Sequence, residues 1–113
     1  MQTIIIKTQF EGIHQWSSAP EEVDFLRSPH RHIFYVEVEM SVEHSDREIE
    51  IISLKRRLNK DILQWMPQQI TDSCEMMAQQ ICDYLRTEYG DERYIEVSVL
   101  EDNENGGKVY YGR

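Results

Sequence analysis

The chain has 113 residues, of which 29% are charged and 40% hydrophobic, and its formal net charge is −9. This length predicts a single domain over residues 1–113, whose core buries roughly two thirds of the surface that the unfolded chain exposes. The acidic balance argues against nucleic acid or an anionic membrane as the main partner, because phosphate groups are bound by clusters of Lys and Arg. The sequence shows no apolar run of membrane-spanning length and no basic lead of a signal peptide, so we expect a cytoplasmic protein.

The first part of the chain predicts two long strands. Residues 3–16 alternate between apolar and polar side chains, with a bulge expected near Gly12, and residues 31–44 alternate in the same way. The intervening residues 17–29 are rich in Ser, Pro and acidic side chains and predict a loop, and residues 44–48 predict a turn. The inward-facing parity comprises Ile4, Ile6, Phe10, His14 and Trp16 in the first strand and His32, Phe34, Val36, Val38, Met40 and Val42 in the second.

Two helices follow the strands. The first is expected from Glu50 to about Leu63, and Pro67 ends or interrupts it. The second starts at a capping box formed by Asp72 and Glu75 and stops at Gly90. Its buried stripe, at helical spacing, comprises Ile70, Cys74, Met77, Ala78, Ile81, Cys82 and Leu85. The two cysteines lie in this stripe and are expected to be small buried hydrophobic residues, with neither a disulfide nor a zinc pair between them.

The last part of the chain predicts two more strands, over residues 94–101 and 108–111, joined by a turn at residues 102–107. The element order is therefore ββααββ. This order is typical of an α+β domain in which a four-stranded antiparallel sheet is covered on one face by two helices.

Three histidines are the first candidate for a functional site. His14 and His32 both lie on the apolar parity of their strands, and His30 shares the face of His32 because side chains two apart on a strand point the same way. If the two strands form a hairpin, the three imidazoles meet at its loop end, and three imidazoles with an open fourth position are typical of a catalytic zinc site. Each histidine could instead be a polar residue satisfied near a strand end. His44 has the inward parity too, but it lies at the far end and is expected to be a turn residue.

Glu101 is the second candidate, because it lies on the apolar parity of its strand, directly after Val97 and Val99. A carboxylate in that position needs partners. It could accept two parallel N–H bonds from a planar ligand such as a 2-amino-4-oxopyrimidine edge. It could also be a strand-end residue that meets solvent or a backbone N–H.

Six segments in chain order resemble the 6-pyruvoyltetrahydropterin synthase and 6-carboxytetrahydropterin synthase family, which has the tunnelling fold. FEGIHQW resembles a first-strand pattern F-x-x-x-H, and HRHIFYVEV resembles the H-G-H-x-Y/F-x-V-x-V segment that supplies two more zinc ligands. EIISLKRRL resembles D-F-x-x-L-K, and DSCEMMAQQICDYL resembles P-T-x-E-x-x-A. VSVLED resembles V-x-V-x-E-T, whose Glu anchors the pterin ring, and NGGKVYYGR resembles the final turn and short strand.

The resemblance implies a zinc site at His14, His30 and His32 and a pterin anchor at Glu101. It further implies zinc-assisted loss of triphosphate from 7,8-dihydroneopterin triphosphate, and subunits that assemble into a trimer or a hexamer with the ligand site between them.

Two parts of the family pattern are missing. No Cys precedes His30, where the family places a catalytic Cys, and residues 59–73 contain no counterpart of its L-D-H segment. Some family members use a Glu in place of the Cys, so Asp24, Glu22 or Glu21 could serve as the acid or base. These three could equally be solvated loop charges.

The leading hypothesis is therefore a zinc-dependent lyase that acts on a dihydropterin triphosphate or a near relative. The alternative is a protein that holds a pterin or purine-like ligand beside zinc without turning it over. A third hypothesis, an oligomeric scaffold with a vestigial site, is disfavoured because an unused inward histidine cluster leaves polar groups unpaired.

Overall fold

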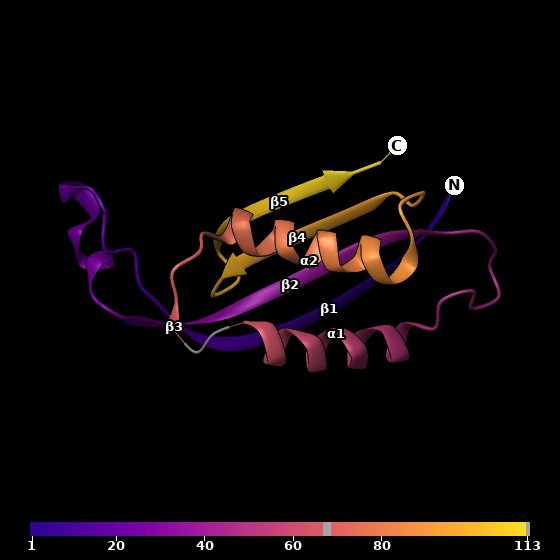
Figure 1. Ribbon diagram of the computed structural model, residues 1–113, viewed down its shortest axis with the longest axis horizontal. Coiled ribbons are helices and arrows are strands. Elements are labelled where there is room, and N and C mark those ends of the chain that lie inside the picture. Colours follow the sequence, from indigo (N-terminus) through magenta and orange to yellow (C-terminus); the bar gives the residue numbers. More distant parts are fainter. Residues whose placement is uncertain (67–68, 113) are drawn as a thin grey trace.

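The computed structural model describes residues 1–66 and 69–112. Figure 1 shows a sheet with two helices packed on one face, as the sequence predicted. Its elements are β1 (Gln2–His14), the 3-10 helix η1 (Glu21–Arg27), β2 (His30–Val42), α1 (Ile51–Trp65), β3 (Gln69–Ile70), α2 (Cys74–Tyr89), β4 (Ile95–Glu101) and β5 (Asn105–Tyr111).

The sheet has the strand order β3-β1-β2-β4-β5. Neighbours among β1, β2, β4 and β5 pair antiparallel, as the α+β prediction requires. The sequence did not predict β3, a strand of two residues that pairs parallel with the end of β1 at Ile13 and His14. Two residues are too short for an alternation pattern to be detected.

Pairing between β1 and β2 runs without a break from Gln2↔Val42 to His14↔His30. The bulge expected near Gly12 is therefore wrong, and Gly12 lies directly opposite His32. The glycine serves close packing instead, because a Cβ at this position would lie 2.6 Å from Cδ1 of Ile70 and 3.3 Å from the ring of Phe34. Because the register is unbroken, the inward-facing residues of β1 and β2 stay on the same face of the sheet as far as the histidines.

The core lies between the sheet and the helices, where α2 covers β4 and β5 and α1 lies against β1 (Figure 1). Most of the strand residues predicted to face inward are buried or half-buried there, and Phe34, Val36, Val38, Val97 and Val99 are buried. The prediction is wrong for Trp16, which lies beyond the end of β1 and is 44% exposed. Each large apolar side chain contributes about 1.5–3 kcal/mol when it is fully buried. Both cysteines are buried and free, as predicted.

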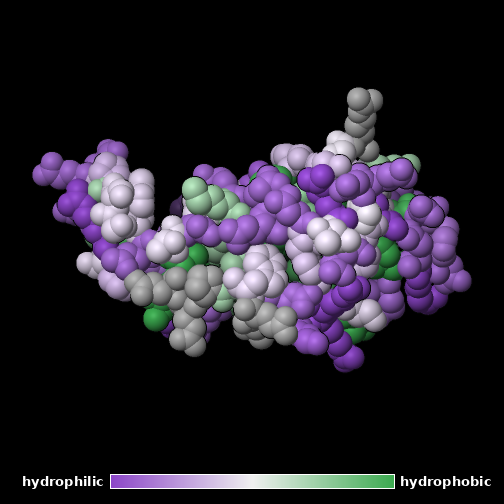
Figure 2. All heavy atoms as spheres, in the orientation of Figure 1, coloured by the Kyte–Doolittle hydropathy of each residue, from purple (hydrophilic) through white to green (hydrophobic). Residues whose placement is uncertain are grey.

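The opposite face of the sheet carries the polar parity. Salt bridges cross it between neighbouring strands, such as Lys7–Glu37 at 3.3 Å and Arg31–Glu11 at 2.6 Å. The side with the helices is also mainly hydrophilic at its surface, with hydrophobic residues visible only in small separate areas (Figure 2). Among the described residues, no helix combines the length and the apolar character needed to cross a membrane.

The helix ends differ in detail from the sequence prediction. Ser73 is the N-cap of α2, and its side chain accepts a hydrogen bond from the backbone N–H of Met76, so the predicted capping box of Asp72 and Glu75 is wrong. Gly90 follows α2 with a φ of +101°, as expected of a stop. The first helix extends to Trp65, and the prediction that Pro67 ends it concerns a residue outside the described ones.

The stretch predicted as a loop over residues 17–29 contains η1 and projects beyond the end of the sheet (Figure 1). We call residues 15–29 the arm. Its base is closed by hydrogen bonds from the backbone N–H of Trp16 to the carbonyl of Leu26 and from Nε of Arg27 to the carbonyl of Ala19. The arm therefore leaves the sheet at the point where β1 ends and returns where β2 begins.

Candidate metal centre

Three histidines meet where β1 ends and β2 begins. His14, the last residue of β1, pairs with His30, the first residue of β2, and His32 lies two residues further along the same face. One ring nitrogen from each histidine forms a group whose members all lie within 4.8 Å of one another. His14 is only 8% exposed, and the other two histidines are half-buried. The described residues thus include a cluster that could hold a metal ion, at the positions that the sequence predicted.

The outer nitrogen of each ring is tied to an oxygen atom. Nε2 of His14 lies 2.9 Å from the carbonyl of Asp72, Nδ1 of His30 lies 2.8 Å from the carbonyl of Ser28, and Nδ1 of His32 lies 2.6 Å from Oδ2 of Asp102. Carbonyl and carboxylate oxygens accept only from an N–H, so these bonds assign a proton to the outer nitrogen of each ring. In the neutral rings, Nδ1 of His14 and Nε2 of His30 and His32 are then free to act as ligands.

Those inner nitrogens fit a metal ion. Nδ1 of His14 and Nε2 of His30 are 3.3 Å apart, and Nε2 of His32 is buried with no hydrogen-bond partner among the residues that the structure describes. Two lone pairs at that separation repel each other unless a cation lies between them. Ligands about 2.0–2.1 Å from a tetrahedral zinc ion lie about 3.3–3.4 Å from one another, which matches the observed spacing. Outer hydrogen bonds from ligand histidines to carbonyls and carboxylates are also typical of metal centres.

Asp102 also contacts the candidate site, and the sequence analysis did not predict it, because residues 102–107 were expected only to form a turn. Its φ of +52° lies in the left-handed region, which Asp tolerates better than most residues. Its carboxylate accepts from His32 and from the backbone N–H of Ile33, at 3.1 Å, and the hydrogen bond from His32 is the main reason that the pKa of Asp102 is lowered. The pairing of Glu101 with Phe34 places residue 102 beside this part of β2, so a correct strand register was the signal that could have found it.

Glu101 reaches the same centre from β4. Its Oε2 lies 3.4 Å from Nε2 of His32, and its Oε1 lies 3.7 Å from Nδ1 of His14. The side chain is 30% exposed, so it is neither a core residue nor a free surface residue. The structure therefore brings Glu101 together with the histidines.

Cys74 lies on the other side of that carboxylate, with its Sγ 3.9 Å from Oε1 of Glu101. Burial, together with the negative charge of Glu101, raises the pKa of the Cys74 thiol to about 12. The thiol is therefore protonated at neutral pH, where a thiolate would be needed for a nucleophile or a metal ligand.

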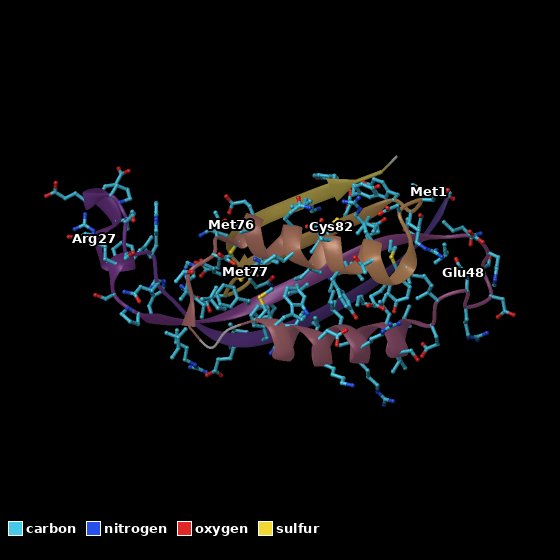
Figure 3. All side chains as sticks on the ribbon, in the orientation of Figure 1. Met1, Arg27, Glu48, Met76, Met77 and Cys82 are labelled. Atoms are coloured by element: carbon cyan, nitrogen blue, oxygen red, sulfur yellow. The ribbon has the colours of Figure 1, made fainter. Side chains whose placement is uncertain are left out.

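A cavity of about 520 Å³ adjoins the histidines. Its apolar wall includes Trp16 and Leu26 from the arm and Met76 from α2, and its polar lining includes His14 and Glu101. Figure 3 shows Met76 on the first turn of α2, where it is 56% exposed. A cavity of this size, apolar with a few polar groups, is typical of small-molecule sites.

The predicted acid or base residues lie elsewhere. Glu21, Glu22 and Asp24 are exposed residues of η1, and none of them belongs to the described residues that line the cavity. Their catalytic role remains a prediction. His44 is exposed in the turn after β2, where its Nδ1 accepts from the backbone N–H of Asp46 at 3.2 Å, as expected of a turn residue.

A scan against protein-family models found no match for this chain, and a search of the curated proteins found no similar protein.

Proposed function

We propose that this protein binds zinc through His14, His30 and His32 and acts as a lyase on a pterin, with 7,8-dihydroneopterin triphosphate or a near relative as its substrate. The observation that carries the proposal is the set of three inner nitrogens, each freed for a metal by a hydrogen bond on the opposite side of its ring. Imidazole also suits copper, iron and nickel, and zinc is favoured here because three histidines with an open position are its common catalytic arrangement.

The cavity supplies the binding site for the ligand in this proposal. Trp16, Leu26 and Met76 offer an apolar wall to a flat heterocycle, and Glu101 offers a carboxylate at the boundary with the histidines. A 2-amino-4-oxopteridine presents two neighbouring N–H groups that a carboxylate accepts in parallel. A bound zinc ion would supply Lewis-acid chemistry, lowering the pKa of a hydroxyl on the ligand.

Loss of triphosphate also needs a base on the protein, which removes a proton from a side-chain carbon of the substrate while the bond to the departing oxygen breaks. Asp24 or Glu22 would supply this base in the lyase proposal if the arm bends toward the cavity. Their position on η1, outside the lining of the cavity, favours the second candidate function, in which the protein binds a pterin-like ligand beside zinc without turning it over.

We also propose the tunnelling fold and a trimeric or hexameric assembly. Apart from the two-residue β3, the long elements follow the order ββααββ with both helices on one face of the antiparallel strands β1, β2, β4 and β5, and this arrangement supports the fold. The edges of the sheet support the assembly, because β5 has a neighbour on one side only and β1 pairs with β3 at two residues only. Exposed strand edges are commonly covered by another chain.

The first experiment is metal analysis and light scattering of freshly purified, unchelated protein. We expect about one zinc per chain and a trimer or hexamer. Protein without metal would contradict the proposed centre, and a monomer at every concentration would contradict the assembly.

The second experiment is calorimetric titration with neopterin, combined with a turnover assay on 7,8-dihydroneopterin triphosphate. Hydrogen bonds to a charged group contribute about 1.5–3 kcal/mol, so Glu101→Gln should weaken neopterin binding by roughly tenfold or more. Glu104→Gln, an exposed carboxylate of the same turn, is the matched control. Turnover supports the lyase, and binding without turnover supports the second candidate. Equal binding by wild type and Glu101→Gln would contradict the anchor.

A further inference from the structure

The carboxylate of Glu101 lies close to the inner nitrogens of His14 and His32, two of the three candidate metal ligands. Nδ1 of His14 lies 3.7 Å from Oε1, and Nε2 of His32 lies 3.4 Å from Oε2. Because the outer nitrogens of both rings already donate to Asp72 and Asp102, each neutral ring turns a lone pair toward the carboxylate. A lone pair facing a carboxylate oxygen is repulsive, and a cation bound between the inner nitrogens and the carboxylate would remove that repulsion.

The distances favour a metal ion as that cation. Tetrahedral ligands with bonds of about 2.0–2.1 Å are separated from one another by about 3.3–3.4 Å. The separation of 3.3 Å between Nδ1 of His14 and Nε2 of His30 and that of 3.4 Å between Nε2 of His32 and Oε2 of Glu101 both have this value, so Oε2 is the oxygen placed to coordinate. The contact of 3.7 Å to Nδ1 of His14 is made by the other oxygen, Oε1.

We infer that Glu101 is the fourth metal ligand of the ligand-free protein, and that a ligand entering the cavity displaces it. Glu101 lies beside the histidines and also lines the cavity, so a molecule bound against Trp16 and Met76 lies next to this carboxylate. The thiol of Cys74, which donates toward Oε1, holds the carboxylate at this boundary. Displacement frees the carboxylate to accept N–H groups of the ligand and opens one coordination position.

This inference rests on the proposed metal site but not on the identity of the ligand. It also means that Glu101 has its two roles one after the other. The carboxylate binds the metal before the ligand enters and accepts the ligand's N–H groups afterwards, because it does not reach the metal and the far edge of a pteridine ring at once. The side chain therefore has one position without ligand and another with it.

The test uses the whole protein loaded with Co²⁺, whose visible spectrum reports the number and geometry of its ligands, together with Zn²⁺ affinity measured by chelator competition. In Glu101→Ala, Zn²⁺ affinity should fall by more than the roughly 10–100-fold that loss of an outer hydrogen-bond partner costs. Azide, a small anionic ligand, should change the Co²⁺ spectrum of Glu101→Ala at a concentration at least about tenfold lower than that needed for wild type, because its coordination position is open.

Two further variants make the outcome specific. Glu101→Gln keeps the size of the side chain and should also lower Zn²⁺ affinity, which guards against a loss caused by misfolding of the alanine variant. Glu104→Ala removes an exposed carboxylate from the same turn and should leave both readouts unchanged. If wild type binds metal and Glu101→Ala matches it in Zn²⁺ affinity and in azide response, the inference is overturned while the metal site stands. If wild type takes up no metal, the proposed function and this inference fall together.

Discussion

The two ends of the sheet carry polar clusters of opposite character. At the end that bears the arm, the inner nitrogens of His14 and His30 face each other, and that of His32 has no hydrogen-bond partner within the described part of the chain. At the other end, near Glu48 in Figure 3, the guanidinium of Arg93 makes two hydrogen bonds to Glu48, at 2.6 and 2.9 Å, and one to the carbonyl of Ser41 at 3.0 Å. Both clusters are largely removed from water, but the second has its charges paired within the chain.

This difference separates a structural cluster from one built for a ligand. Buried polar groups in folded proteins are almost always hydrogen-bonded, because an unpaired one costs about 1–3 kcal/mol. Glu48 and Arg93 obey that rule within the chain and tie the end of β2 to the start of β4. The inner nitrogens of the histidines lack such partners among the described residues, which supports the proposed metal centre. The predictions below test this difference between the two clusters, beginning with the largest expected effect.

Loss of one inner nitrogen should have the largest effect. His32→Ala removes a ligand and should abolish stoichiometric zinc binding, because two imidazoles remain of three. The matched control is His44→Ala, which removes the remaining histidine of the chain from an exposed turn and should bind one zinc. Elemental analysis of both variants gives the answer. Full zinc content in His32→Ala would show that the centre does not depend on this ring.

Removal of the Asp102 carboxylate, which accepts a hydrogen bond from the His32 ring, should have a smaller effect. Asp102→Asn keeps the size of the side chain and the tolerance for a φ of +52°, but it removes the carboxylate that accepts from His32. Zinc affinity should fall by about 10–100-fold, as is usual for an outer partner of a ligand histidine. The control is Asn103→Gly, at the neighbouring left-handed position with a φ of +60°. Equal affinity in wild type and Asp102→Asn, measured by chelator competition, would reduce Asp102 to a turn residue.

At the other end of the sheet, the expected effect is on stability and not on metal binding. Glu48→Gln should lower the free energy of unfolding by about 1.5–3 kcal/mol at neutral pH, because it removes charged hydrogen bonds to Arg93. Those bonds lower the pKa of Glu48 from its ordinary value of 4.5 to about 2. The difference between wild type and variant should therefore be fully present above pH 4.5 and shrink as the pH falls toward 2.

Urea denaturation of the metal-free proteins over this pH range provides the measurement. Glu92→Gln, an exposed residue next to Arg93 in the sequence, is the control and should follow wild type. A difference between wild type and Glu48→Gln that stays constant down to the lowest pH would contradict the assigned charge pair.

The smallest effect is expected at the start of α2. Ser73→Ala removes the N-cap hydrogen bond to Met76, at 3.1 Å, and should cost about 1 kcal/mol of stability. Zinc affinity should change less than in Asp102→Asn. The oxygen that accepts the hydrogen bond from His14 is the backbone carbonyl of Asp72, which the substitution leaves in place. Thermal unfolding and chelator competition on the same preparation test both statements. A larger loss of affinity than of stability would mean that the cap also sets the position of His14.

Much of the fold and part of the site follow from local pattern. Alternation in β1 and β2 gives the parity of His14, His30 and His32, and the same period in β4 gives that of Glu101, because successive side chains of a strand point to opposite faces. The helical stripe places Cys74 and Cys82 in the core for the same kind of reason. Most errors fall where the chain departs from periodicity, as at η1, the short β3 and the N-cap of α2. The exception is the bulge expected near Gly12, where the pairing continues and the glycine serves close packing.

What the sequence by itself determined is which side chains face the core, since parity is a local property of each strand. Only the tertiary structure decided which atoms meet there. His32 and Asp102 lie 70 residues apart in the chain, and His14 and the carbonyl of Asp72 lie 58 residues apart. Such contacts depend on the register of β4 against β2, on the left-handed turn at Asp102 and on the place where α2 begins. They arise only when the packed core holds these distant segments in one arrangement, because a shift of one residue in register would turn Glu101 and its neighbours to the opposite face.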